Sequence, residues 1–365
     1  MAAEYQIVVV NPGSTSTKFG LYRDDKPHFV SNLRHTDAEL EPFRGRPILD
    51  QQEFRGKLIE AELARHGIPL NELSAAVGRG GLLRPLASGT YRVNQLMLDE
   101  LKRAERGEHA SNLGAYIAHG LAQHAGVPAF VVDPVSVDEW PDKTRLSGST
   151  LLERQCLSHA LNTKAVGKRF AKEQGKSYDR LNLVIAHVGS GISVSAHTRG
   201  RMVDVTNSRE EGAFSTERSG TVPCMKLVEL CFSGKYTAKQ VEAILFREGG
   251  LYSYLGTKDL VEVEKRIDAG DAKAKLVFDA MIYQIAKEIG AMSAVLSGKV
   301  DSILLTGGMA HSVRLTGELA KQIGWIAPVH VYPGEDELQA LAEGALRVLR
   351  GEEKIREFGT SAMGA

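Results

Sequence analysis

Two short loops rich in glycine, serine and threonine could bind phosphate. The first spans residues 11–18, Asn-Pro-Gly-Ser-Thr-Ser-Thr-Lys, and the second spans residues 187–193, His-Val-Gly-Ser-Gly-Ile-Ser. Such loops offer backbone N–H groups and hydroxyls to an anion without side-chain bulk. Neither is a Walker A loop, because the Gly-Lys-Ser tripeptide at 175–177 has Phe170 where that motif needs its first glycine. We expect the two loops to face one triphosphate.

Each loop follows a short apolar strand and opens a predicted β-meander. The first meander has strands at 7–10, 19–22 and 28–33, and the second has strands at 183–186, 194–197 and 202–205. Gly13 and Gly189 hold the same place in the two meanders. This internal repeat predicts two similar lobes, against the alternative that two common meanders resemble each other by chance.

Helices are predicted around both meanders by apolar residues at three- and four-residue spacing. They span residues 53–66, 96–106, 111–125, 151–174 and 273–296. Two late strands, 302–305 and 330–332, each lead through a loop into a helix, an arrangement that gathers ligand atoms at strand ends. The last helix, 338–350, is a candidate to pack back onto the first lobe. We predict an N-terminal lobe of residues 1–135 with 338–365, and a nucleotide-binding lobe of residues 136–337.

Composition narrows the class of protein. A chain of 365 residues usually forms two domains, and equal numbers of basic and acidic residues, 45 each, argue against a nucleic-acid partner. The three cysteines, Cys156, Cys224 and Cys231, lack metal-site spacing and are predicted to be reduced core residues. No signal peptide or long apolar run is present, so we expect a cytoplasmic protein without a membrane partner.

Four motifs in this order resemble those of the acetate and butyrate kinases. They are the two loops already described, Glu-Arg-Ser-Gly at 217–220 and Thr-Gly-Gly at 306–308. In that family they correspond to two phosphate loops, an arginine segment and an adenosine loop. Four ordered matches over most of the chain are more specific than any one of them.

Other segments look closer to the butyrate kinase branch of the family. They are Val-Gly-Arg-Gly-Gly at 77–81, His-Ala-Ser-Asn-Leu-Gly at 109–114 and Val-Asp-Pro-Val at 132–135. The resemblance implies an α/β fold of two duplicated actin-like ATPase domains (βββαβαβα, RNase H-like) with a central nucleotide cleft. The duplication agrees with the repeat.

The resemblance also implies site residues. Those around ATP or ADP are Asn11, Ser14, Ser16, Lys18, Gly189, Ser190, Gly191, Gly307, Gly308 and Met309. Arg79 and Arg218 would clamp the carboxylate and the transferring phosphoryl group, because a planar guanidinium matches both anions. His187 would donate a hydrogen bond to the phosphoryl oxygens. Asp133 and Glu337 would hold Mg²⁺ directly or through water.

Several of these residues have a structural alternative. His187 could be a buried core histidine, and the two arginines could be surface ion-pair partners, although each lies within two residues of a glycine that would let a ligand approach closely. Asp133 could cap a turn, and the acidic residues 335–337 could favour a helix N-terminus. His109 either lines the substrate pocket or merely precedes the N-cap of a helix.

The expected reaction is phosphoryl transfer from ATP to a small aliphatic carboxylate, giving an acyl phosphate and ADP. A carboxylate needs no general base, whereas a sugar hydroxyl does, so a set of residues rich in arginine and poor in bases favours a carboxylate. By resemblance the acid is butyrate or a branched short-chain acid, and the protein is a homodimer or higher homo-oligomer. The alternatives are an acetate or propionate kinase, a sugar kinase, and a non-kinase ATP-driven module of the same superfold.

Overall fold

The structure is a computed structural model that describes residues 4–359. The chain forms two compact units. Unit 1 contains the residues up to Asp138 and those from Asp336 onward, and unit 2 contains Glu139–Glu335.

Unit 1 is built on a seven-stranded sheet in the order β12-β5-β6-β4-β1-β2-β3. The first three strands form the predicted antiparallel meander, while β1, β4 and β6 run parallel. The strands are β1 (Gln6–Pro12), β2 (Ser16–Arg23), β3 (Lys26–Arg34), β4 (Ala75–Arg79), β5 (Thr90–Arg92), β6 (Ala129–Val132) and β12 (Arg356–Glu357).

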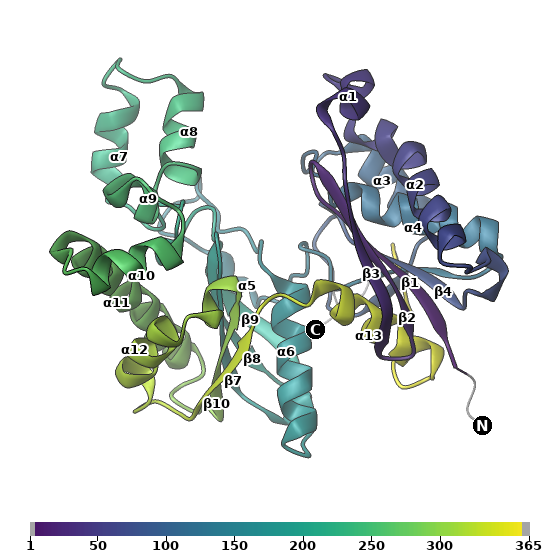
Figure 1. The fold of residues 1–365 in the computed structure, drawn as a ribbon. Helices are drawn as coiled ribbons and strands as arrows, with labels where there is room; N and C mark the ends of the chain where they lie inside the picture. Colours follow the sequence, from purple (N-terminus) through teal and green to yellow (C-terminus); the bar gives the residue numbers. More distant parts are fainter. Residues whose placement is uncertain (1–3, 360–365) are drawn as a thin grey trace. The chain divides into compact units, whose positions relative to one another are not determined.

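Helices cover both faces of this sheet (Figure 1). Alternate strand residues point to opposite faces, so Val131 joins the apolar core beneath α2 and α4, whereas Val132 meets Gly344 of α13. A Cβ on Gly344 would lie 2.5 Å from a Val132 methyl, so the last helix packs directly on β6. The helices are α1 (Asp37–Leu40), α2 (Gln52–Arg65), α3 (Gln95–Arg103), α4 (Asn112–Ala125) and α13 (Glu337–Leu349).

Unit 2 repeats the central part of this architecture. Its five-stranded sheet has the order β11-β10-β7-β8-β9, which matches β6-β4-β1-β2-β3 strand for strand in order and direction. The duplication predicted from the two loops is therefore confirmed. The strands are β7 (Leu183–Val188), β8 (Ile192–Thr198), β9 (Arg201–Val205), β10 (Ser302–Gly307) and β11 (Val329–Pro333).

The alternating residues of β7 divide the core of unit 2 into two layers. Val184, Ala186 and Val188 pack with the long α11, while Leu183 and Ile185 pack with α6. Figure 1 shows α7 and α8 as a pair beside the sheet rather than on it. The helices are α5 (Asp142–Arg145), α6 (Ala160–Glu173), α7 (Cys224–Cys231), α8 (Ala238–Phe246), α9 (Gly250–Leu255), α10 (Leu260–Asp268), α11 (Ala272–Val295) and α12 (Val313–Ile323).

Two sequence predictions about unit 2 are wrong. The helix predicted at 151–174 begins only at Ala160, because Leu151 and Leu152 are 89% and 71% exposed and provide no face to bury. Cys224 and Cys231 lie on α7, which buries none of its residues, so these two thiols are exposed rather than in the core. Cys156 is buried as expected.

Candidate functional site

The predicted residues gather at the carboxyl ends of the parallel strands in each unit. In unit 1, β1 leads into the first loop, β4 ends at Arg79, and Asp133 follows β6. In unit 2, β7 leads into the second loop, β10 ends at Gly307, and Glu335 follows β11. Parallel strands bring their carboxyl ends to one edge of a sheet, which is where open α/β sheets bind ligands.

The first loop is the tight turn of the β1–β2 hairpin. The Gly13 N–H donates to the Ser16 carbonyl oxygen at 2.8 Å, and Ser14 lies exposed at the tip. Lys18 is exposed on β2. The loop thus presents its polar groups to the outside of unit 1.

Asn11, Arg79 and Glu337 form one cluster in unit 1. The Asn11 Nδ2 and the Arg79 Nη1 each donate to the Glu337 Oε2 at 2.6 Å. Both charged side chains are largely buried, with 23% of Arg79 and 13% of Glu337 exposed. The structure therefore brings a predicted substrate clamp and a predicted metal ligand into one ion pair.

Asp133 and His109 have their own polar contacts. The buried Asp133 carboxylate accepts from the Ser88 hydroxyl at 2.6 Å and from the Gly89 N–H at 2.7 Å, and its φ of 38° fixes the turn after β6. The His109 Nδ1 lies 2.8 Å from the Ser111 hydroxyl, directly before α4. Neither contact assigns a ligand to these side chains.

The glycines near the two arginines are packed closely against other parts of the chain. A Cβ on Gly78 would lie 2.0 Å from the carbonyl oxygen of Gly114 in α4, and one on Gly80 would lie 2.4 Å from Pro134. Gly220 is likewise pressed against the backbone of Phe214. Close packing of the chain therefore requires these glycines, while Arg79 lies at the end of β4 and Arg218 lies beside the second loop.

His187 is buried at the end of β7 and held from three sides. Its Nε2 lies 2.9 Å from the Glu335 Oε1, and its Nδ1 lies 3.1 Å from the Asn162 Oδ1. The ring of His159 stacks on it at 3.8 Å between centroids with a 7° tilt. These partners fix the orientation of the imidazole and aim its Nε2 toward Glu335 and Gly189.

Arg218 lies against the second loop. Its Nη1 donates to the Ser208 hydroxyl at 2.8 Å, and a Cβ on Gly191 would lie 2.7 Å from the same nitrogen. The hydroxyl of Ser215 donates to the Ser190 carbonyl and accepts from the Arg218 backbone N–H. Ser215 therefore links the second loop to the segment that carries Arg218. Burial lowers the pKa of Arg218, because removal from water disfavours the charged guanidinium.

One cavity of about 510 Å³ in unit 2 joins the second loop to the predicted adenosine loop. Its walls include Gly189, Ser190, Gly308, Met309 and Glu335. Gly307 shapes this corner, because its φ of 94° and a Cβ position only 2.3 Å from the Val188 carbonyl oxygen exclude a side chain. The volume is in the range that suits a small-molecule ligand.

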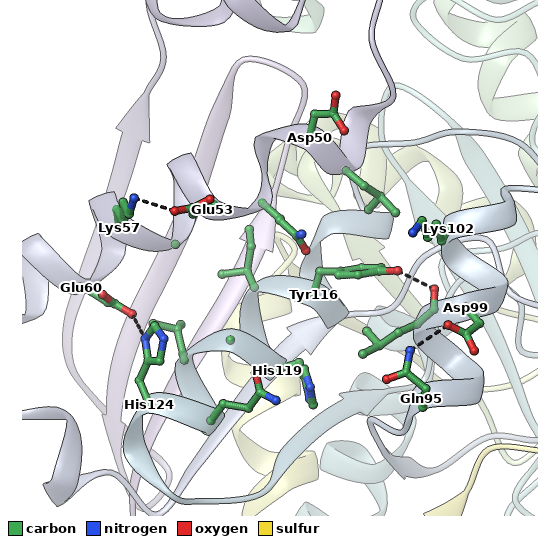
Figure 2. Close-up of a pocket in the computed structure, with 18 residues that line it drawn as sticks. Asp50, Glu53, Lys57, Glu60, Gln95, Asp99, Lys102, Tyr116, His119 and His124 are labelled. Atoms are coloured by element: carbon green, nitrogen blue, oxygen red, sulfur yellow. Dashed lines mark hydrogen bonds and ion pairs between the residues drawn. The ribbon is translucent and has the colours of Figure 1, made fainter.

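A second cavity, of about 740 Å³, lies among α2, α3 and α4 of unit 1 and contains none of the predicted residues (Figure 2). Its charged side chains are partly satisfied by one another, as in the pairs Lys57–Glu53 and His124–Glu60. The Tyr116 hydroxyl donates to the Leu98 carbonyl. This cavity offers no converging set of groups for the predicted chemistry.

The predicted carboxylates, Asp133 and Glu337, could supply only part of the ligands around a Mg²⁺ ion. Within residues 4–359, no three histidine, cysteine, aspartate or glutamate side chains cluster as a metal site. Mg²⁺ in phosphoryl-transfer sites commonly uses one or two carboxylates with waters and substrate phosphates. Asp133 and Glu337 are carboxylates of this chemical kind, although Asp133 already accepts from Ser88 and Gly89, and Glu337 already pairs with Arg79.

Sequence reasoning did not single out Asn162, His159 or Arg55. The first two hold His187, and the buried Arg55 binds the inner side of the first loop. All three lie on or beside helices at positions where the sequence alone does not separate buried from exposed side chains. The stacking of His159 on His187 also depends on the packing of α6 against β7, which joins residues that are not neighbours in the sequence.

Comparisons with known proteins agree with this architecture. A probable butyrate kinase from Listeria monocytogenes serotype 4b (strain CLIP80459) is 49% identical over 355 residues, covering 97% of this chain and 99% of the relative. Among solved structures, acetate kinase from Porphyromonas gingivalis (TM-score 0.77, 18% identity) covers 94% of this chain and all of its own. A propionate kinase from Francisella tularensis (TM-score 0.71, 16% identity) covers 93% and 98%. At these identities the solved structures establish the fold alone.

The two duplicated units define an actin-like ATPase fold. The acetokinase family profile matches residues 150–323, and the chain belongs to this family. Across residues 4–359, no helix is both long and apolar enough to span a bilayer.

Proposed function

We propose that this protein transfers the γ-phosphoryl group of ATP to butyrate or a branched short-chain acid. The general class, a phosphotransferase with a carboxyl group as acceptor, follows from membership of the family. The choice of butyrate is supported by the 49% identity to a probable butyrate kinase over nearly the whole chain. The observation that carries the nucleotide site is the cavity between the second loop and Gly308.

Nucleotide binding is assigned to groups of both units. In unit 2, Gly189, Ser190 and Gly191 would bind phosphates, and the segment from Gly307 to Met309 would pass beneath the adenosine. In unit 1, Asn11, Ser14, Ser16 and Lys18 would bind the β- and γ-phosphates. Backbone N–H groups and small side chains suit this task, because phosphate must approach the chain closely.

The reaction needs charge neutralisation rather than a base. An ionised carboxylate oxygen attacks the γ-phosphorus, a new O–P bond forms, and the bond from that phosphorus to the β-phosphate bridging oxygen breaks to release ADP. Arg79 and Arg218 would hold the two anions together, and His187 would donate to the phosphoryl oxygens. His109 would line the acyl pocket. Mg²⁺, held by Asp133 and Glu337, would neutralise charge on the phosphates.

Location and assembly belong to the same proposal. Cytoplasmic residence is supported by the two exposed thiols of Cys224 and Cys231, which suit a reducing compartment. A homodimer or higher homo-oligomer is supported by exposed apolar side chains on and after α7, where Met225 is 70% and Phe232 is 87% exposed.

Trapping with hydroxylamine tests the function directly, since it converts acyl phosphates into coloured hydroxamates. The purified protein is incubated with ATP, Mg²⁺ and straight or branched acids of increasing length. We expect hydroxamate with butyrate or a branched acid in preference to acetate. If no acid gives a product above the ATP-only background, the proposal fails; a preference for acetate would correct the substrate only.

A further inference from the structure

Arg55 of α2 binds the inner side of the first phosphate loop and is completely buried. Its Nη1 donates to the carbonyl oxygens of Gly13 at 2.7 Å and Ser16 at 3.0 Å, and its Nη2 donates to that of Ser14 at 2.9 Å. Further bonds go to the Thr17 hydroxyl and the Gln51 side-chain oxygen. Every one of these acceptors is uncharged.

A buried arginine without a carboxylate is unusual, because buried charges are normally paired. Among residues 4–359, no aspartate or glutamate forms an ion pair with Arg55. Burial lowers the pKa of Arg55 to about 10, which leaves the guanidinium charged at neutral pH. His35, 2.9 Å from the Thr17 hydroxyl, has its pKa lowered by burial and then by the charge of Arg55. The guanidinium of Arg55 beneath the loop is therefore held by neutral acceptors, with no carboxylate bonded to it.

The bonds to Arg55 set the direction in which the loop presents its amides. All described peptide bonds are trans, so each carbonyl points opposite to the N–H of the next residue. Since the carbonyls of Gly13 and Ser14 point at Arg55, the N–H groups of Ser14 and Thr15 point away from it. Neither N–H bonds to an acceptor within the described residues, and both residues are exposed. Two successive outward amides form a cradle for an anion.

We propose that Arg55 is a positioning residue for phosphate binding. It holds the loop carbonyls inward so that the amides of Ser14 and Thr15 meet the terminal phosphates of the nucleotide. The positive charge of Arg55 offsets the partial negative charges of those carbonyl oxygens. The partial positive charges of the outward N–H groups then dominate where the phosphate would lie. This inference rests on the proposed function only in taking a nucleotide as the ligand of the loop.

Calorimetric binding of the magnesium complexes of ADP and of a non-hydrolysable ATP analogue tests this role. We expect R55M to raise the Kd of the ATP analogue by about 100-fold, as misplacement of a binding group does, and R55K to raise it less, because lysine keeps the charge without the planar fork. The measurement needs no acyl acceptor. A wild-type protein that binds nucleotide but makes no acyl phosphate would thus refute the proposed function and leave this test intact.

The matched control is I59A, one turn further along α2 in the apolar core. It destabilises unit 1 without touching the loop, so its Kd should stay at the wild-type value. Wild-type affinity in R55K and R55M, or a loss no greater than that of I59A, would overturn the proposal. If R55M does not fold, hydrogen exchange of residues 12–17 in R55K decides: weaker protection by the ATP analogue than in wild type supports the role, and equal protection refutes it.

Discussion

The guanidinium of Arg79 and the carboxylate of Glu337 form an ion pair, with 2.6 Å between Nη1 and Oε2. The same carboxylate oxygen accepts from the Asn11 side chain, also at 2.6 Å. One carboxylate on the first turn of α13 therefore binds the ends of both β1 and β4. This contact joins three residues far apart in sequence, and each of them belongs to the proposed chemistry.

Glu337→Gln should weaken the response of the enzyme to Mg²⁺. Glutamine can still accept from Asn11 and Arg79, so the cluster keeps its shape, but the charge that would attract the metal is lost. We expect the free Mg²⁺ concentration for half-maximal rate to rise by about tenfold or more, a loss of about 1.4 kcal/mol. The measurement is the initial rate of hydroxamate formation against free Mg²⁺ at saturating ATP.

Glu343→Gln is the control for this change, because it removes the same charge from the same helix. Glu343 accepts from Gln339 and lies away from the cluster. Its Mg²⁺ dependence should match that of wild type. An unchanged Mg²⁺ response in Glu337→Gln would remove Glu337 from the metal site and leave it only the role of orienting Arg79.

Arg218→Ala should abolish acyl-phosphate formation while the protein folds and binds ADP. The arginine contacts Ser208 and the second loop, so its removal leaves the sheet intact but takes away a cation that would act on the transferring group. Removal of such an arginine costs about 10³-fold or more in kcat. The assay is hydroxamate formation with ADP affinity measured in parallel.

Arg209→Ala supplies the comparison for Arg218→Ala. Arg209 is exposed on the same segment, pairs with Glu242 at 3.7 Å and lies over the Phe246 ring. An exposed pair of this kind contributes little, so its kcat should stay near wild type. Retained activity in Arg218→Ala would rule out the clamp.

The parts of the fold that were predictable are those set by local patterns. The two hairpins were found because apolar strands alternate with glycine-rich turns, and α4 and α11 because their apolar stripes meet a sheet. The helices α7 to α10 were missed, since α7 buries no residue and α8 buries only Val241. The false start at Leu151 has the same origin: apolar spacing shows a possible face, but not whether anything covers it.

In the site, too, residues in local motifs were predictable and contacts between distant segments were not. The loops and arginines were named from motifs; the structure places the loops and Arg79 at strand ends and Arg218 beside the second loop. The pairing of Arg79 with Glu337, and the burial of Arg55, depend on contacts between segments distant in sequence. Such contacts leave no local pattern, so a single sequence does not reveal them.

Gly307→Ala and Gly308→Ala should differ although the residues are neighbours. A methyl at Gly307 would lie 2.3 Å from the Val188 carbonyl oxygen at a φ of 94°, so it should cost about 1–3 kcal/mol or more of folding free energy. A methyl at Gly308 meets nothing within 4 Å, so stability should stay within about 0.5 kcal/mol of wild type. Gly308 lines the cavity, and its variant should bind ADP more weakly.

Urea unfolding and ADP titration separate these two effects. Gly307→Ala should lower the free energy of unfolding, and urea unfolding alone detects this change. A stable Gly307→Ala would contradict the tight contact between β10 and β7. Unaltered ADP binding in Gly308→Ala would place the nucleotide away from this loop.

His197 should make unit 2 less stable in mild acid. The ring is fully buried, with its Nδ1 2.6 Å from the Tyr178 hydroxyl and its Nε2 2.7 Å from that of Ser195. Burial, and then the charge of Lys164, lower the pKa of His197 well below 6.5. In the unfolded chain the same ring takes up a proton near its ordinary pKa, so below that pH the unfolded state binds more protons than the folded state.

The contribution of His197 is therefore complete above about pH 6.5 and is lost as the pH falls toward its folded-state pKa, by up to about 1.4 kcal/mol per pH unit. His197→Gln keeps a polar side chain of similar size but cannot take up the proton. Urea unfolding at several pH values between about 8 and 5 should show a shallower decline for His197→Gln than for wild type. Parallel declines would contradict this prediction, because they would mean that His197 is protonated to the same extent in the folded and unfolded states.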